Sequence, residues 1–458
     1  MFEFGRELKR LFGSDAINAP RDGLTGGDAS LLELLDLQMI VQEGKAADVA
    51  AGRVGTKDKA QRRLESAIVW REIARRSGEA AVLRKAAATA EAAAEAFGRD
   101  RRPDGWARAR CEQAFCAMLG AELFGDEGLN AAADLAFREA RAAARGGLAL
   151  PLADIGVAAI EAREQLAWGD SRAARAVVQR FGAPIAALQG LTRRCRAARL
   201  LAVEARLVLA DILIAWGARL RDPEILNIAR DEAERAGRGL DSSFEPLSWA
   251  RAAALKGQAM ALLGEVMGDV ETLAQAVTAL ADVVGELSRE HSPLDWARSQ
   301  TALAQGLQAL GEAGASERAY EQAVTCYDRA AHVLRKTPGL SLRAFGASNR
   351  ALCLARSAEL SGDLTVLDAA EAAFKIELTA LSARREPAAW ALLQVNLARL
   401  YEARIDITGQ DRGERAAAAL ALNGALDVFA ELGLRSLSVI ATEALERIAT
   451  PAATARPA

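Results

Sequence analysis

The stretch Pro293-Leu-Asp-Trp-Ala-Arg298 recurs along the chain and decides the fold. It is found 47 residues earlier as Pro246-Leu-Ser-Trp-Ala-Arg251, and 94 residues later, twice 47, as Pro387-Ala-Ala-Trp-Ala-Leu392. The unit between the last two carries Arg343 at the tryptophan position. A fixed period of this kind is typical of proteins that stack one small structural unit many times.

Two columns of small residues hold the same phase. One column is Ala210, Gly257, Ala304, Ala351 and Ala398, and the other is Ala229, Ala276, Ala323, Ala370 and Ala417. Apolar residues fall around them with a helical period, so each unit is predicted to be a pair of amphipathic helices. Proline suits the first turn of the first helix, and Gly-Glu or Gly-Asp pairs mark the turn between the helices. Trp249, Trp296 and Trp390 are predicted to pack between helices.

The column pattern resembles the tetratricopeptide repeat. A small residue is followed by Leu or Tyr three positions on, and the next helix has Ala with an aromatic residue four later, as in Ala323 and Tyr327 or Ala370 and Phe374. The unit is longer than the roughly 34 residues usual in that family. The resemblance implies an all-α, right-handed α-solenoid of stacked antiparallel helix pairs, in which the concave face binds extended peptides or partner proteins.

The rest of the chain is assigned by the same patterns. The capping box Ser30-Leu-Leu-Glu33 predicts the start of an apolar helix, and the last helix is expected to bury Leu437, Ile440, Ala444, Leu445 and Ile448. The expected organisation is an amphipathic helix over 1–13, a linker over 14–59 with one helix at about 30–43, degenerate helix pairs over 60–186, regular 47-residue repeats over 187–432, a capping helix over 433–450 and a disordered tail over 451–458.

Composition argues against several classes of function. The 458 residues are 51% hydrophobic with a net charge of −3, which excludes wholesale disorder and argues against a nucleic-acid partner. Only two histidines occur, and the chain has no phosphate-binding loop, H-E-x-x-H or G-x-S-x-G motif. Five scattered cysteines include no C-x-x-C. We therefore expect no catalytic residue, metal or cofactor, and a cytoplasmic, bacterial protein without a signal peptide or membrane span.

Polar residues beside the buried columns are the candidates for partner binding. Amide side chains offer both a donor and an acceptor to a peptide backbone, and guanidinium groups add charge-assisted hydrogen bonds. These positions are Arg251, Gln258, Arg298, Gln305, Asn349, Asn396 and Arg399. They predict a non-catalytic adaptor or scaffold that binds a protein or peptide in its concave groove. The alternative is that they are simply exposed polar residues.

A second hypothesis concerns the N-terminus, where one face of a short helix carries Phe4, Leu8, Leu11 and Phe12. A helix this short needs a surface on which to form. Residues 1–12 carry a surplus of only one basic side chain, which favours a protein groove over a lipid surface. This predicts a regulatory protein docked through residues 1–12 to an enzyme that it controls or to a membrane.

Two arginine clusters are a further candidate, for an anionic partner. They are Arg99, Arg101, Arg102, Arg108 and Arg110, and Arg193, Arg194, Arg196 and Arg199. Few aromatic residues lie among them, so stacking on single-stranded nucleic acid is poorly supported. The favoured interpretation is ordinary surface charge paired with nearby acids.

Overall fold

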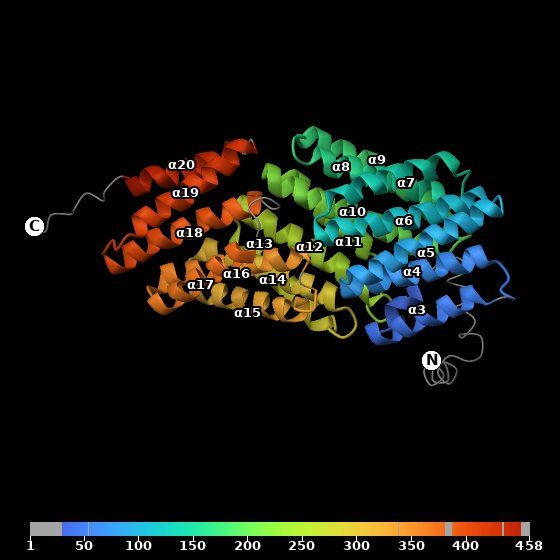
Figure 1. Ribbon diagram of the computed structural model, residues 1–458, viewed down its shortest axis with the longest axis horizontal. Helices are drawn as coiled ribbons and strands as arrows, with labels where there is room; N and C mark the ends of the chain where they lie inside the picture. The colour runs from blue at the N-terminus through green and yellow to red at the C-terminus, as the bar shows by residue number, and fades with distance from the viewer. Residues whose placement is uncertain (1–29, 54, 338, 381–386, 433–434, 450–458) are drawn as a thin grey trace, which may run out of the picture. The chain divides into compact units, whose positions relative to one another are not determined.

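The computed structural model describes residues 30–53, 55–337, 339–380, 387–432 and 435–449 (Figure 1). These residues form helices and connecting turns, with no strand among them. The elements are η2 (Ser30–Leu34), α3 (Leu37–Gly52), α4 (Lys59–Ser77), α5 (Ala80–Arg99), α6 (Pro103–Phe124), α7 (Glu127–Ala143), α8 (Ala149–Gln165), α9 (Ser171–Leu191), α10 (Ala197–Leu220), α11 (Pro223–Gly237), α12 (Pro246–Met267), α13 (Val270–Glu286), α14 (Pro293–Gly314), α15 (Glu317–Leu334), α16 (Ser341–Ser361), α17 (Leu364–Ala380), α18 (Pro387–Thr408), α19 (Glu414–Glu431) and α20 (Arg435–Ala449).

Consecutive helices pack against each other, which confirms the predicted all-α solenoid of helix pairs. The pairs include α4 with α5, α6 with α7, α10 with α11, α12 with α13, and α18 with α19. The first helices also contact one another in turn, from α4 through α6, α8 and α10 to α12. The first helices therefore form a continuous layer of their own, and this layer holds the candidate site.

The helices divide between two compact units. Unit 1 comprises the described residues up to Gly306 together with His332–Ser341, and unit 2 comprises Leu307–Ala331 and the described residues from Leu342 onward. Each unit has its own buried core, rich in alanine and leucine. None of the described helices is long and apolar enough to cross a bilayer.

The turns between helices follow the predicted Gly-Asp signal. Gly125 and Gly268 have φ of +66° and +68°, in the left-handed region that glycine adopts without a steric penalty. The aspartates that follow, Asp126 and Asp269, accept hydrogen bonds from the first backbone N–H groups of α7 and α13. Each pair of residues thus ends one helix and caps the next.

The small-residue columns are buried where the repeat predicts, with one shift of register. Ala229, Ala276, Ala323 and Ala370 have no exposed surface, and a Cβ atom at Gly257 would lie only 2.7 Å from Leu280. In the last unit, however, the fully buried residue is Ala418, and Ala417 is half-buried. The turn between α18 and α19 spans residues 409–413, and this longer turn displaces α19 by one residue from the column.

The tryptophan column has the predicted packing role. Trp249 and Trp296 are half-buried against a cluster that contains Leu247, Val283 and Leu287. Trp390 packs in the same way against the core of α18, α19 and α20.

Three expectations about the first and last described helices are wrong. The predicted helix at 30–43 is instead the 3₁₀ helix η2 followed by α3, which is capped by Asp36 and continues to Gly52. The carboxylate of Glu33, expected to cap its own helix, binds the start of α12 instead. In α20 the fully buried residue is Ala441, whereas Ile440 is 51% exposed. Residues 1–29 and 450–458, including Phe4, Leu8, Leu11 and Phe12, lie outside the described residues.

Candidate functional site: an internal peptide-binding network

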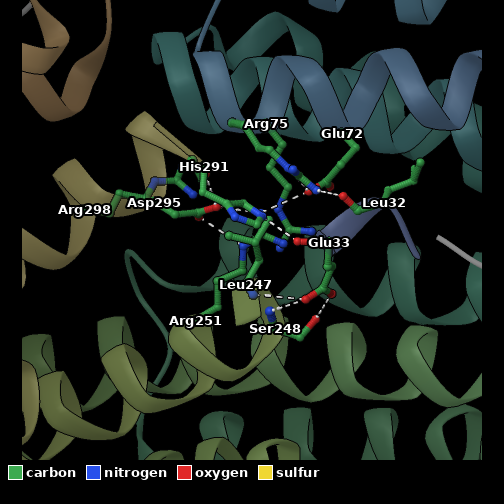
Figure 2. A network of polar contacts seen from close by, with 12 residues as sticks. Leu32, Glu33, Glu72, Arg75, Leu247, Ser248, Arg251, His291, Asp295 and Arg298 are labelled. Atoms are coloured by element: carbon green, nitrogen blue, oxygen red, sulfur yellow. Dashed lines mark hydrogen bonds and ion pairs between the residues drawn. The ribbon is translucent and has the colours of Figure 1, made fainter. Parts of the chain in front are cut away.

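A network of buried polar groups in unit 1 holds a short stretch of the same chain, residues 30–36, which we call the anchor segment (Figure 2). Its central contact is the carboxylate of Glu33. One oxygen accepts hydrogen bonds from the backbone N–H groups of Leu247 at 3.1 Å and Ser248 at 2.9 Å, and the other accepts from the Ser248 hydroxyl. Because Pro246 begins α12, these N–H groups lie in its first turn and have no partner within the helix. The positive end of the helix dipole also favours an anion there.

The backbone of the anchor segment is held as well as its side chain. The fully buried guanidinium of Arg76 donates to the carbonyl oxygens of Leu35 at 2.6 Å and Leu32 at 2.9 Å. The His291 ring nitrogen Nε2 forms a hydrogen bond with the Glu33 carbonyl oxygen. Three backbone carbonyl groups, those of Leu32, Glu33 and Leu35, are therefore recognised without regard to their side chains.

Ion pairs fix the groups that hold the anchor segment. Arg251 makes two hydrogen bonds to Asp295, at 3.0 and 2.7 Å, and lies 3.4 Å from Glu72, which in turn binds Arg76 at 2.9 Å. These contacts join α4, α12 and α14, which are far apart in the sequence (Figure 2). The charged side chains are thus brought together by the way the helices of unit 1 stack, and not by closeness in the sequence.

Burial and charge shift the pKa values of the three carboxylates in opposite directions. Burial disfavours the charged form of Glu72, but Arg251 and Arg76 outweigh this effect and lower its pKa to about 2. Arg251 likewise holds the pKa of Asp295 well below its usual value, against the effect of burial. For Glu33 burial prevails over the Ser248 hydrogen bonds and Arg251, and the pKa is raised.

A pH dependence of stability follows from the two lowered values. A carboxylate with a depressed pKa stabilises the fold fully above its unfolded pKa, here 4.5 for Glu72, and loses this contribution as pH falls to about 2. We expect the urea concentration at the unfolding midpoint of the wild-type protein to decrease as the pH is lowered from 5 to 2.5. The Glu72→Gln/Asp295→Asn variant should show a flatter dependence. If the urea midpoint changes equally with pH in the two proteins, Glu72 and Asp295 are not the source of the pH dependence.

The charged layer continues along the first helices of the pairs, from α4 to α14. We call the surface that these side chains form the inner face of unit 1. Glu112 is fully buried between Arg71 and Arg108, and Arg75 binds Glu204 at 2.7 Å. Further along, Arg298 pairs with Glu122, and Arg163 lies 3.8 Å from Asp211. Two of these pairs join helices that are not consecutive in the layer: Arg75 joins α4 to α10, and Arg298 joins α14 to α6.

A cavity of about 110 Å³ opens beside these ion pairs. Its floor is apolar, formed by Phe115, Met118, Leu152, Ile155, Leu201 and Val208. Its rim carries Arg75, Glu122, Arg163 and Glu204. The pocket around Glu33 is also lined by Arg71, Leu201 and Glu204, which border this cavity too, so the two sites are neighbours on one face.

The carboxylate of Asp211 lies 3.8 Å from the guanidinium of Arg163, which lines the cavity. Burial raises the pKa of Asp211, and the nearby carboxylate of Glu122 raises it further, against the smaller effects of Arg163 and Arg298. The side chain of Asp211 is nevertheless 56% exposed.

The seven predicted partner-binding residues are not brought together. Arg251, Gln258, Arg298 and Gln305 lie in unit 1, and Asn349, Asn396 and Arg399 lie in unit 2. Arg251 and Arg298 belong to the network described above, each paired with an acid of the same chain. Gln258 and Gln305 are half-buried on α12 and α14.

In unit 2 one of the three predicted residues, Arg399, lines a separate cavity. The Asn349 amide donates to the carbonyl oxygen of Phe345 at 3.0 Å, and Asn396 is half-buried. Arg399 lines a cavity of about 560 Å³ together with Glu402 and Asp406.

Sequence reasoning missed most of the anchor site. Glu33 was expected to act within its own helix. His291 was not among the predicted binding residues, yet it is half-buried and its ring binds the Glu33 carbonyl oxygen. A usable signal exists in α4, where Glu65, Glu72 and Arg76 share the buried face of an otherwise apolar stripe. Buried charges at helical spacing indicate a partner that is not local.

Four members of the two arginine clusters are paired with acids of the same chain. Arg102 binds Asp58, Arg108 binds Glu112, Arg110 binds Glu139 and Arg199 binds Glu245. This supports ordinary charge pairing for these members. Among the described residues no group of three or more His, Cys, Asp or Glu side chains is placed to hold a metal ion.

Comparison with known proteins gives only distant likenesses. No family model and no curated protein matches the chain. One similar solved structure is a Rap protein complexed with the competence and sporulation factor, at 10% identity and a TM-score of 0.44, covering 85% of this chain and 97% of that one. Another is a circular tandem repeat protein with novel repeat topology, at 17% identity and a TM-score of 0.26, covering 88% and 96%. The function is therefore argued from the site itself.

Proposed function

We propose that the chain is a non-catalytic scaffold of the tetratricopeptide type, which binds an extended segment of a protein partner on the inner face of unit 1. One observation carries this proposal: the same face already holds the anchor segment through backbone carbonyls and one carboxylate. Main-chain hydrogen bonds give affinity for any extended peptide, and the side-chain pocket adds specificity.

The partner segment is defined by what the inner face offers. The apolar floor around Phe115, Leu152 and Val208 takes an apolar side chain. The partner segment thus carries an apolar side chain that enters the cavity.

The predicted residues take different parts in this proposal. Arg251 and Arg298 position the charged layer through Asp295 and Glu122, and Gln258 and Gln305 extend it. Asn349, Asn396 and Arg399 are proposed to bind a further stretch of the partner in unit 2.

Filling the cavity tests this function. We expect Val208→Arg to weaken the binding of peptides selected from a random library on the full-length wild-type chain by about tenfold or more, because the new side chain occupies the apolar floor. The matched control is Leu135→Arg on α7, where the side chain is already 58% exposed. Fluorescence anisotropy titrations compare the three proteins. Equal affinities for wild type and Val208→Arg would contradict a site in this cavity.

A further inference from the structure

We propose that the anchor segment is a displaceable internal ligand, which competes with a peptide of another protein that presents a glutamate between leucines. This inference rests on the proposed function, since it assumes that the inner face of unit 1 binds peptides. It adds a second element of recognition, for an acidic residue, at the start of α12.

The pocket that holds the anchor segment is built for an acidic peptide. If it were empty, the N–H groups of Leu247 and Ser248 and two donors of the fully buried Arg76 would lose their acceptors. Buried donors without acceptors are strongly disfavoured. A replacement ligand must therefore bring a carboxylate and, at the same spacing, two backbone carbonyl groups.

The anchor segment can leave without unravelling its neighbour. The chain breaks its helical path at Leu35 and Asp36, and α3 has its own cap because the Asp36 carboxylate accepts from the Met39 N–H at 2.8 Å. Leu34 is 38% exposed. The segment is thus a short 3₁₀ turn, held against α4, α12 and His291 by hydrogen bonds of Leu32, Glu33 and Leu35. A peptide that makes the same hydrogen bonds can take its place.

Burial of the Glu33 carboxylate limits how strongly the anchor segment docks. The carboxylate is desolvated on docking, which raises its pKa and opposes the docking of the charged form at neutral pH. The titratable groups that face it are Glu72 and Arg76 of α4, Arg251 of α12, and His291 and Asp295 near the start of α14. A covalent tether offsets this cost in the intact chain, because it supplies a high local concentration of the segment.

The two parts of the inner face are contiguous. Leu201 and Glu204 line both the Glu33 pocket and the apolar cavity. A partner segment that lies in the cavity can therefore extend into the pocket once the anchor segment has left. Partner binding and release of the anchor segment are in this way linked.

A synthetic peptide with the sequence of residues 28–37, Asp-Ala-Ser-Leu-Leu-Glu-Leu-Leu-Asp-Leu, tests the proposal. Labelled peptide is titrated into full-length wild type, Glu33→Lys and Glu33→Gln. Lysine cannot accept from the α12 N–H groups and is repelled by the helix dipole, so Glu33→Lys should bind the peptide at least about tenfold more tightly than wild type. Glutamine keeps an acceptor and should behave like wild type. A control peptide with lysine in place of glutamate should bind none of them.

Equal binding of the peptide to wild type and Glu33→Lys, or equal binding of the two peptides, would overturn the proposal. If Glu33→Lys does not fold, hydrogen exchange of the wild-type protein decides: saturating peptide should remove protection from residues 30–37, and the lysine peptide should not. Unchanged protection would overturn the proposal. The Val208→Arg titration tests the proposed function independently. If Val208→Arg weakens partner binding but Glu33→Lys does not change peptide binding, the scaffold function is retained and the internal ligand is rejected.

Discussion

Replacing Trp216 by alanine is expected to lower the free energy of unfolding by about 3–5 kcal/mol. Trp216 lies in α10 with no exposed surface, and its indole nitrogen donates to the carbonyl oxygen of Ala162 at 3.3 Å. The Arg219 guanidinium lies 5.6 Å from the ring centre. The substitution therefore leaves a large cavity between α8 and α10 and an acceptor without its donor.

Urea unfolding followed by circular dichroism measures this loss. Because each pair in a solenoid contacts chiefly its neighbours, hydrogen exchange should show loosening of α8 and α10 before the other helices. The control is Trp168→Ala, since Trp168 is 73% exposed and should change stability by less than about 0.5 kcal/mol. Similar losses for the two variants would refute the packing role of Trp216.

Replacing Glu112 by alanine should also cost about 3–5 kcal/mol. The side chain is completely buried on α6 and binds the guanidinium groups of Arg71 and Arg108, which are 13% and 10% exposed. Without Glu112 both guanidinium groups remain buried but lose the carboxylate that balances their positive charge. Breaking a buried ion pair from one side is far more costly than replacing the whole group with apolar residues.

Two variants make this prediction specific. Glu139→Ala removes the partner of Arg110, but the Glu139 side chain is 41% exposed, so the loss should stay below about 1 kcal/mol. The triple variant Arg71→Met/Arg108→Met/Glu112→Leu should recover most of the stability lost in Glu112→Ala. Urea midpoints compare all four proteins. A Glu112→Ala variant as stable as Glu139→Ala would show that the charges are not coupled as described.

The fold could be predicted because its signals are local. A helix pair of 47 residues repeats its buried alanines, its starting proline and its Gly-Asp turn, and each of these acts between residues close in sequence. The register failed only at Ala417, where a longer turn precedes α19. The tryptophan column was predicted correctly, but the largest fully buried side chain among the described residues is Trp216, which lies outside that column.

The candidate site was predictable only in part, because it depends on the superhelical path. Arg251 and Arg298 stood out by their equal spacing, yet the acids that bind them lie 44 and 176 residues away. Glu33 fits a local capping box equally well, and its contact with Ser248 spans 215 residues. Local patterns cannot distinguish a carboxylate that caps its own helix from one that caps a distant helix.

Photo-crosslinking tests most directly the claim that the inner face of unit 1 binds peptides. A photoreactive benzoylphenylalanine replaces Phe115 at the cavity, or Leu135 on α7 and Leu420 on α19 as exposed controls. We predict that a library-selected peptide crosslinks strongly to position 115, and that excess unlabelled peptide abolishes this crosslink. Crosslinking at positions 135 or 420 with none at 115 would contradict the account.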